Sequence, residues 1–171
     1  MNHVVFSDEK KFNLGGPDCY SSYWHDLRHK DPPRLNRNFG GDSAMCWAAF
    51  SSSSKTPMCF ISSNMNSKMY TDLLGDILIP FIDDKMEDSA IFQQDNASIH
   101  VSIITKSWFV DRNIHVLNWP ACNPDMNPIK NLWGILSRRV YANSRQFGDI
   151  AELKQEINSA WRSIGQEHYS P

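Results

Sequence analysis

Short apolar runs separated by turn residues fill the first third of the chain. The segments between these runs are rich in Gly, Pro or Ser, and they include Gly15 to Asp18, residues 28–41 and the serines at 51–54. Runs of this length and spacing favour antiparallel hairpins. The candidate strands are residues 3–7, 20–24, 43–50 and 57–62.

Beyond residue 65 the apolar positions change to a helical spacing. Within residues 66–85, Met69, Leu73, Ile77 and Phe81 recur every three or four positions, which is typical of one face of a helix. The same pattern predicts three more helices, at 101–112, from 127 to about 140, and at 149–164, with short strands at 89–94 and 114–117.

Polar and proline residues mark where the predicted helices start and stop. Asn66 or Ser67 is a candidate cap for the first helix, and Pro80 is expected to kink or stop it near its end. Asn127 is a candidate cap for a later helix, and Pro128 suits the first helical position, where its missing N–H is not needed.

Strands followed by alternating helices and strands predict an α/β fold. Such an order is typical of a mixed sheet with helices on both faces. The length of 171 residues suits one domain, so we expect residues 1–171 to form a single unit.

Composition narrows the class of protein. Hydrophobic residues make up 41% of the chain, as in globular proteins, and a formal net charge of −2 argues against a stand-alone nucleic-acid binder. The four cysteines have no zinc-site spacing and are expected to be free thiols: Cys19, Cys46, Cys59 and Cys122. Without a signal pattern or an apolar stretch of about 20 residues, a soluble intracellular protein with no membrane partner is expected.

Two acidic residues follow apolar runs and are the first candidates for chemistry. Asp8 and Asp95 would both reach a crevice at the sheet edge if each ends a strand. Two carboxylates there could hold Mg²⁺, which prefers oxygen ligands. The alternative is that each is a helix cap or turn residue. Glu9 would point to the opposite face of its strand and is a poor substitute ligand.

Five sequence blocks, in order, resemble those of the Tc/mariner superfamily of DNA transposases. They are FSDEKKFNL, Gly40 to Trp47, QQDNASIH, NWPA and NPDMNPIKNLW, and they cover nearly the whole chain. The match is nearest to nematode Tc-type transposases. It implies a ribonuclease H-like fold, with Asp8 and Asp95 as the first two catalytic and metal-binding acids.

The resemblance also implies a cofactor, partners and a location. Family members use Mg²⁺ or Mn²⁺ to cut and join DNA at transposon ends, take no small-molecule substrate, work in the nucleus and can form homodimers. They carry N-terminal helix-turn-helix units that this sequence lacks, so we expect a truncated copy or a partial gene model.

The third acid of the family pattern, a glutamate in NPIENLW, is Lys130 here. An ammonium has three donors and no acceptor, so it cannot ligate a metal and should pair with the two aspartates instead. We therefore predict that strand cleavage and transfer are lost and that Lys130 marks a degenerate catalytic position.

Other residues leave alternatives open. His100 would orient Asp95 or touch DNA, or is simply a helix-start or core histidine. Arg138 and Arg139, with Arg145, would contact phosphates, or form a solvated helix face. The tryptophans at 47, 119 and 133 are expected in the core rather than as base-stacking platforms.

Three functions compete at this point. The first is a degenerate transposase catalytic domain, and the second is a co-opted module that binds DNA or a protein without chemistry. The third is an unrelated ribonuclease H-like hydrolase that uses Asp8, Asp95 and Asp125, although Asp125 is expected rather to shape its turn.

Overall fold

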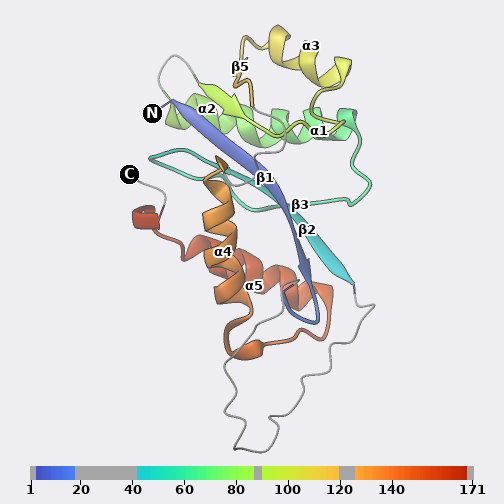
Figure 1. The fold of residues 1–171 in the computed structure, drawn as a ribbon, viewed down its shortest axis with the longest axis vertical. Coiled ribbons are helices and arrows are strands. Elements are labelled where there is room, and N and C mark those ends of the chain that lie inside the picture. Colours follow the sequence, from blue (N-terminus) through green and yellow to red (C-terminus); the bar gives the residue numbers. More distant parts are fainter. Residues whose placement is uncertain (1–2, 18–41, 87–89, 120–125, 169–171) are drawn as a thin grey trace, which may run out of the picture.

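A computed structural model describes residues 3–17, 42–86, 90–119 and 126–168. Figure 1 shows a central sheet with α1, α2 and α3 on one side and α4 and α5 on the other. The predicted α/β architecture, a mixed sheet with helices on both faces, is confirmed. None of the helices in these ranges is long and apolar enough to cross a membrane.

The sheet has the strand order β3-β2-β1-β4-β5. Its first three strands pair in antiparallel fashion, as the hairpin pattern predicts. β4 pairs with β1 in parallel, and β5 pairs with β4 in parallel. The strands are β1 (Val4–Asn13), β2 (Ser43–Phe50), β3 (Cys59–Ile61), β4 (Ile91–Gln93) and β5 (His115–Val116).

One difference from the sequence-based prediction concerns β1. The apolar run indicated a strand over residues 3–7, but the strand continues through charged residues to Asn13 because β2 pairs with it along that length. Asp8 therefore lies in the middle of β1, opposite Ala48, and the expectation that it ends a strand is wrong.

The helical segments follow the predicted order. They are α1 (Ser67–Leu73), η1 (Leu74–Leu78), α2 (Ile79–Lys85), α3 (Ile103–Asp111), α4 (Ile129–Val140), η3 (Ala142–Ser144), α5 (Ile150–Arg162) and η4 (Gln166–His168). The candidate strand at 20–24 and the loop at 28–41 lie outside the described residues.

Side chains cap the helices where the sequence indicates. Asn66 accepts a hydrogen bond from the backbone N–H of Met69 at the start of α1. The Asn127 side chain accepts one from the N–H of Ile129, 3.3 Å away, at the start of α4. These bonds satisfy N–H groups that have no partner inside a helix.

Pro80 does not stop its helix. It is the second residue of α2, which begins directly after the π-helical segment η1. A proline removes one N–H from the helix, and the wider π turns upstream of it let the chain continue without a break. The segment therefore continues to Lys85.

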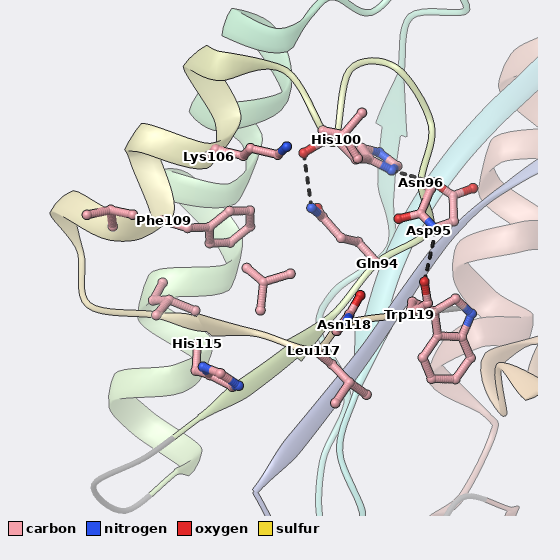
Figure 2. Close-up of a pocket in the computed structure, with 14 residues that line it drawn as sticks. Gln94, Asp95, Asn96, His100, Lys106, Phe109, His115, Leu117, Asn118 and Trp119 are labelled. Carbon is pink, nitrogen blue, oxygen red and sulfur yellow. Dashed lines mark hydrogen bonds and ion pairs between the residues drawn. The ribbon is translucent and has the colours of Figure 1, made fainter. Parts of the chain in front are cut away.

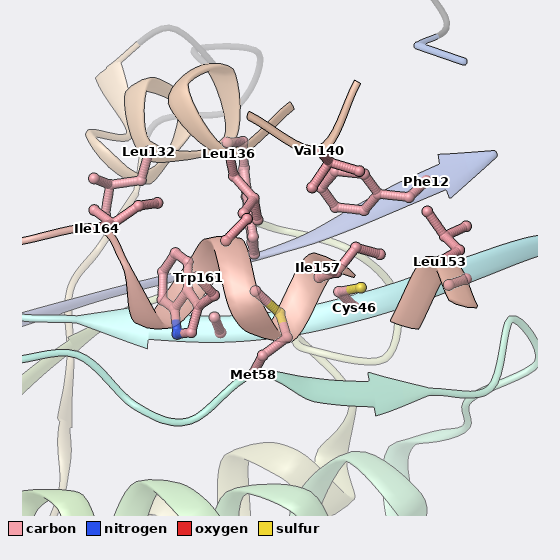
Figure 3. Close-up of a cluster of buried hydrophobic side chains, with 14 of the residues drawn as sticks. Phe12, Cys46, Met58, Leu132, Leu136, Val140, Leu153, Ile157, Trp161 and Ile164 are labelled. Carbon is pink, nitrogen blue, oxygen red and sulfur yellow. The ribbon is translucent and has the colours of Figure 1, made fainter. Parts of the chain in front are cut away.

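Two apolar cores flank the sheet. Figure 3 shows the core between the sheet and α4 and α5, in which Leu132, Leu136 and Trp161 belong to one buried cluster with Cys46 of β2. The second core places Trp47 of β2 against α1, η1 and α3. Trp47 and Trp133 are 0% and 3% exposed, which confirms that both are core residues.

Candidate functional site

The first acid of the site, Asp8, lies on the side of β1 that α4 covers. Its side chain is 7% exposed, and its Oδ2 accepts hydrogen bonds from Lys130 Nζ at 2.5 Å and from Trp133 Nε1 at 2.9 Å. Both donors come from the first turns of α4. The structure therefore brings Lys130 to Asp8, one of the two aspartates with which the sequence predicts it to pair, whereas Asp95 is bonded to His100.

The start of α4 is fixed to β1 by a neighbouring bond. The Asn127 amide donates to the backbone carbonyl of Ser7 at 3.0 Å, while its oxygen caps Ile129. Because Ile129 is fully buried, Lys130 lies on the exposed side of the same turn and reaches Asp8.

Burial and the ion pair with Lys130 shift the pKa of Asp8 in opposite directions. Burial raises the pKa of the Asp8 carboxyl above its usual range, and the ammonium of Lys130 offsets part of this rise. Lys130 thus compensates a carboxylate that would otherwise be costly to bury.

The second acid, Asp95, lies two residues beyond β4 and is partly exposed. It lines a different cavity from Asp8, so the structure does not show the single crevice that the sequence predicts for the two acids. Asp95 Oδ1 accepts a hydrogen bond from the N–H of Ala97 at 2.9 Å. The same oxygen accepts a second from His100 Nδ1 at 2.5 Å, and Figure 2 shows these two side chains facing each other. The hydrogen bond from His100 holds the pKa of Asp95 below its usual range.

His100 lies between Asp95 and a further acidic residue, Glu9. Its ring is 3% exposed, and its Nε2 lies 3.4 Å from Glu9 Oε1. Burial alone would lower the pKa of His100, but the hydrogen bond with Asp95 and the nearby carboxylate of Glu9 outweigh it and raise the pKa to about 9. These contacts are those expected of a residue that orients Asp95.

A buried hydrogen-bond network holds the imidazole in place. The Tyr70 ring centroid lies 4.4 Å from that of His100, and the Tyr70 hydroxyl donates to Gln94 Oε1 at 2.7 Å. The Gln94 amide donates in turn to the His100 carbonyl at 3.2 Å. Rigid support of this kind fixes the direction in which the imidazole meets Asp95.

Glu9 is the site residue that the sequence did not identify. Its predicted orientation is correct, since it lies on the opposite side of β1 from Asp8, but its partner His100 was not foreseen. The available signal was strand alternation, which sends Glu9 to the side where the QQDNASIH segment lies. The pairing itself depends on the parallel contact between β1 and β4.

Two cavities border these acids. One, of about 530 Å³, lies between Asp95, α3 and the segment after β5; Figure 2 shows Lys106 and Phe109 on its α3 side and Leu117 and Trp119 on the other. The second, of about 430 Å³, is lined by Asp8, Lys130 and Arg138 among others.

The two candidate DNA-contacting arginines lie apart. Arg138 lines the smaller cavity, whereas Arg139 donates to the Ser163 hydroxyl at 2.7 Å and its guanidinium lies 3.2 Å from His168 Nε2. Arg145 pairs with Glu152 and Glu156 on the surface of α5. Cys19, Cys122 and Asp125 lie outside the described residues.

The side chains do not fit a magnesium site in this arrangement. Asp8 Oδ2 is bonded to an ammonium and an indole, and Asp95 Oδ1 to an imidazole and a backbone N–H. Across the described ranges no three His, Cys, Asp or Glu side chains are grouped so as to hold a metal ion. The residue at the third position of the family pattern, which would complete a set of metal ligands, is Lys130, and its amine cannot ligate a metal.

Sequence comparisons place these residues in a known context. The family model described as DDE superfamily endonuclease matches residues 3–154. The Tc3 transposase of Caenorhabditis elegans is 49% identical over 94% of this chain, and the Tc1 transposase of the same species is 34% identical over 94%. The chain spans about half of the first relative (49%) and 59% of the second.

Solved structures share the fold. The catalytic domain of the Mos1 mariner transposase matches with a TM-score of 0.72 at 18% identity, covering 98% of this chain and 74% of that one. The Mos1 paired-end complex with the left transposon end matches with a TM-score of 0.82 at 20% identity, covering 98% and 50%. Other Mos1 paired-end complexes contain Mn or Mg. The predicted ribonuclease H-like fold is thereby confirmed.

Proposed function

Because this chain belongs to the DDE superfamily of endonucleases, within its Tc/mariner transposases, we propose that it is a transposase catalytic domain that no longer cuts or joins DNA strands. The observation that carries the proposal is the bond from Lys130 Nζ to Asp8 Oδ2. In this reading residues 1–171 form one catalytic-type domain, with Asp8 and Asp95 as its remaining acids and Lys130 at the degenerate third position.

The physical argument is one of charge. An ammonium about 4 Å from a divalent ion is repelled by several kcal/mol even at an effective dielectric constant of about 20. Each ~1.4 kcal/mol corresponds to a factor of ten in rate. Lys130 both removes a ligand and adds this repulsion, so strand cleavage that depends on Mg²⁺ or Mn²⁺ should be lost.

DNA is the partner that the relatives suggest. Mos1 structures are described as complexes with a transposon end and as a strand transfer complex. We extend DNA binding to this chain, with Arg138 and Arg139 as candidate phosphate contacts and His100 as the residue that orients Asp95. A nuclear location and a homodimer follow from the same family relation and are proposed on that basis alone.

Cleavage of a labelled DNA duplex tests the proposal. We expect the purified chain to nick transposon-end DNA in Mg²⁺ or Mn²⁺ no faster than its Asp95→Asn variant, with an active Tc-type transposase as the positive control. Nicking that requires a divalent ion and is abolished in Asp95→Asn would contradict it.

A co-opted binding module is the second candidate. The observation that favours it is the cluster of Lys130 and Arg138 around one cavity beside Asp8. Under this candidate DNA is held with no turnover, and the affinity falls steeply with salt, as phosphate contacts require.

A further inference from the structure

The smaller of the two cavities is rich in cations. It lies between β1 and the first turns of α4 and has a volume of about 430 Å³. Three side chains in its lining carry a positive charge: Lys10, Lys130 and Arg138. A cavity with this lining attracts anions, in contrast to the chain as a whole, whose formal net charge is −2.

The two acidic residues that line the cavity already have partners. Asp8 is bonded to Lys130 and Trp133, and Glu9, whose side chain lies on the other side of β1, has its Oε1 3.4 Å from His100 Nε2. Among the described residues, no ion pair is recorded for Lys10 or Arg138. The charge left for a ligand is therefore positive.

The ammonium of Lys130 has N–H donors that its bond to Asp8 does not use. Its side chain is 44% exposed, and within the described residues its one recorded side-chain bond goes to Asp8. An ammonium carries three N–H donors, so two remain for an anion at the mouth of the cavity.

A glycine in α4 leaves room beside these cations. Gly134 lines the cavity, and a Cβ built on it would lie 3.6 Å from Arg138 Nη1. Glycine is unfavourable in the interior of a helix. Here its missing side chain allows a ligand to approach the backbone of α4 next to the guanidinium.

We propose that this cavity binds a phosphate of the DNA backbone directly, without a divalent cation. Lys130 and Lys10 supply point charges, and Arg138 supplies the planar fork of donors that suits phosphate oxygens. The replacement that removes a metal ligand thus provides a phosphate ligand in the same place. The inference rests on the proposed function, because it assumes that DNA is the ligand.

The test is DNA binding in the absence of metal. The probe is a fluorescein-labelled duplex of about 25 base pairs, titrated in EDTA and followed by fluorescence anisotropy. We expect saturable binding in EDTA that added Mg²⁺ does not strengthen. Arg138→Gln should weaken it about tenfold and lower the slope of log affinity against log salt by about 1.

Two variants distinguish DNA binding in the cavity from a general effect of positive charge on DNA affinity. Gly134→Ala should weaken binding severalfold while the melting temperature stays the same or rises, because alanine favours a helix and the new methyl group narrows the cavity. Lys85→Gln, which removes the same charge from α2 outside the cavity, should change affinity less than twofold. The melting curve of each variant shows that it is folded.

Three outcomes would overturn the inference: no binding in EDTA, binding that appears only with Mg²⁺, or equal losses in Lys85→Gln and Arg138→Gln. These outcomes concern DNA binding. Metal-dependent nicking by the unmodified chain is a separate result, and it would overturn the proposed function instead.

Discussion

At the scale of single residues, two networks of charged side chains define the site. Lys130 neutralises Asp8 on one side of β1, and His100 bridges Glu9 and Asp95 on the other. Neighbouring residues of one strand thus carry separate charge networks, because strand alternation sends Asp8 and Glu9 to opposite sides.

Replacing the lysine should restore affinity for a divalent ion. In Lys130→Glu a carboxylate takes the place of the ammonium beside Asp8, so oxygen ligands replace a cation. We expect binding of Mn²⁺, measured by electron paramagnetic resonance, to become at least tenfold tighter than in the unmodified chain. Lys130→Gln is the matched control for loss of charge alone. An unchanged titration in Lys130→Glu would count against Asp8 as part of a metal pair.

The histidine bridge should make folding stability depend on pH. The pKa of His100 rises from 6.5 to about 9 in the folded chain, so the folded state binds the proton more tightly. The stabilisation is fully present below pH 6.5 and is lost as the pH rises toward 9. We expect the free energy of unfolding to fall by about 1–3 kcal/mol between about pH 6 and pH 8.5.

Urea denaturation at several pH values measures this effect. The same series on His100→Gln should be nearly flat over this range, since the titrating group is absent. A slope of equal size in His100→Gln would assign the dependence to another group.

At the scale of elements, Lys55 ties the β2–β3 connection to the end of α5. Its Nζ donates to the carbonyl of Trp161 at 2.6 Å and to that of Ile164, and it lies over the Trp161 ring. Carbonyls at a helix C-terminus lack partners inside the helix, and a cation there also complements the helix dipole.

Removing this ammonium should destabilise the fold. We expect Lys55→Met to lower the free energy of unfolding by about 1–2 kcal/mol, because the carbonyl of Ile164 loses its donor and that of Trp161 loses one of its donors. Lys68→Met removes an exposed pair with Asp72 on α1 and should change it by less than about 0.5 kcal/mol. Thermal unfolding followed by circular dichroism compares the two, and equal effects would refute the special role of Lys55.

At the scale of the whole molecule, the two cores share the strands between them. Val5 and Trp47 pack into the core beneath α1 and α3, while Phe12 and Cys46 of the same strands pack beneath α4 and α5. Loss of packing in one core should therefore destabilise both cores, since both are built on the same sheet.

The cavity-forming variant Leu136→Ala tests this coupling. Leu136 of α4 is fully buried against the sheet-side core, so we expect a loss of about 2–5 kcal/mol in the free energy of unfolding. With 5-fluorotryptophan, the ¹⁹F signals of Trp108 and Trp161, which report the two cores, should still disappear at the same urea concentration. Ile103→Ala, at a site 87% exposed on α3, should cost less than about 0.5 kcal/mol. Separate midpoints for the two signals would show that the cores unfold independently.

The sequence by itself determined the order of elements, the helix caps at Asn66 and Asn127, and the amine in place of the third acid. These features are local, because periodicity, capping and residue type act within a few positions of the chain. The family blocks also indicated the ribonuclease H-like fold.

Only the tertiary structure decided that β1 continues past Asp8, that Glu9 meets His100, and that Lys10, Lys130 and Arg138 line one cavity. Each of these depends on strand pairing or helix packing between residues far apart in the chain. Local patterns do not fix such contacts, since the partner strand sets the length of β1 and the packing of α4 on the sheet sets the position of its cations.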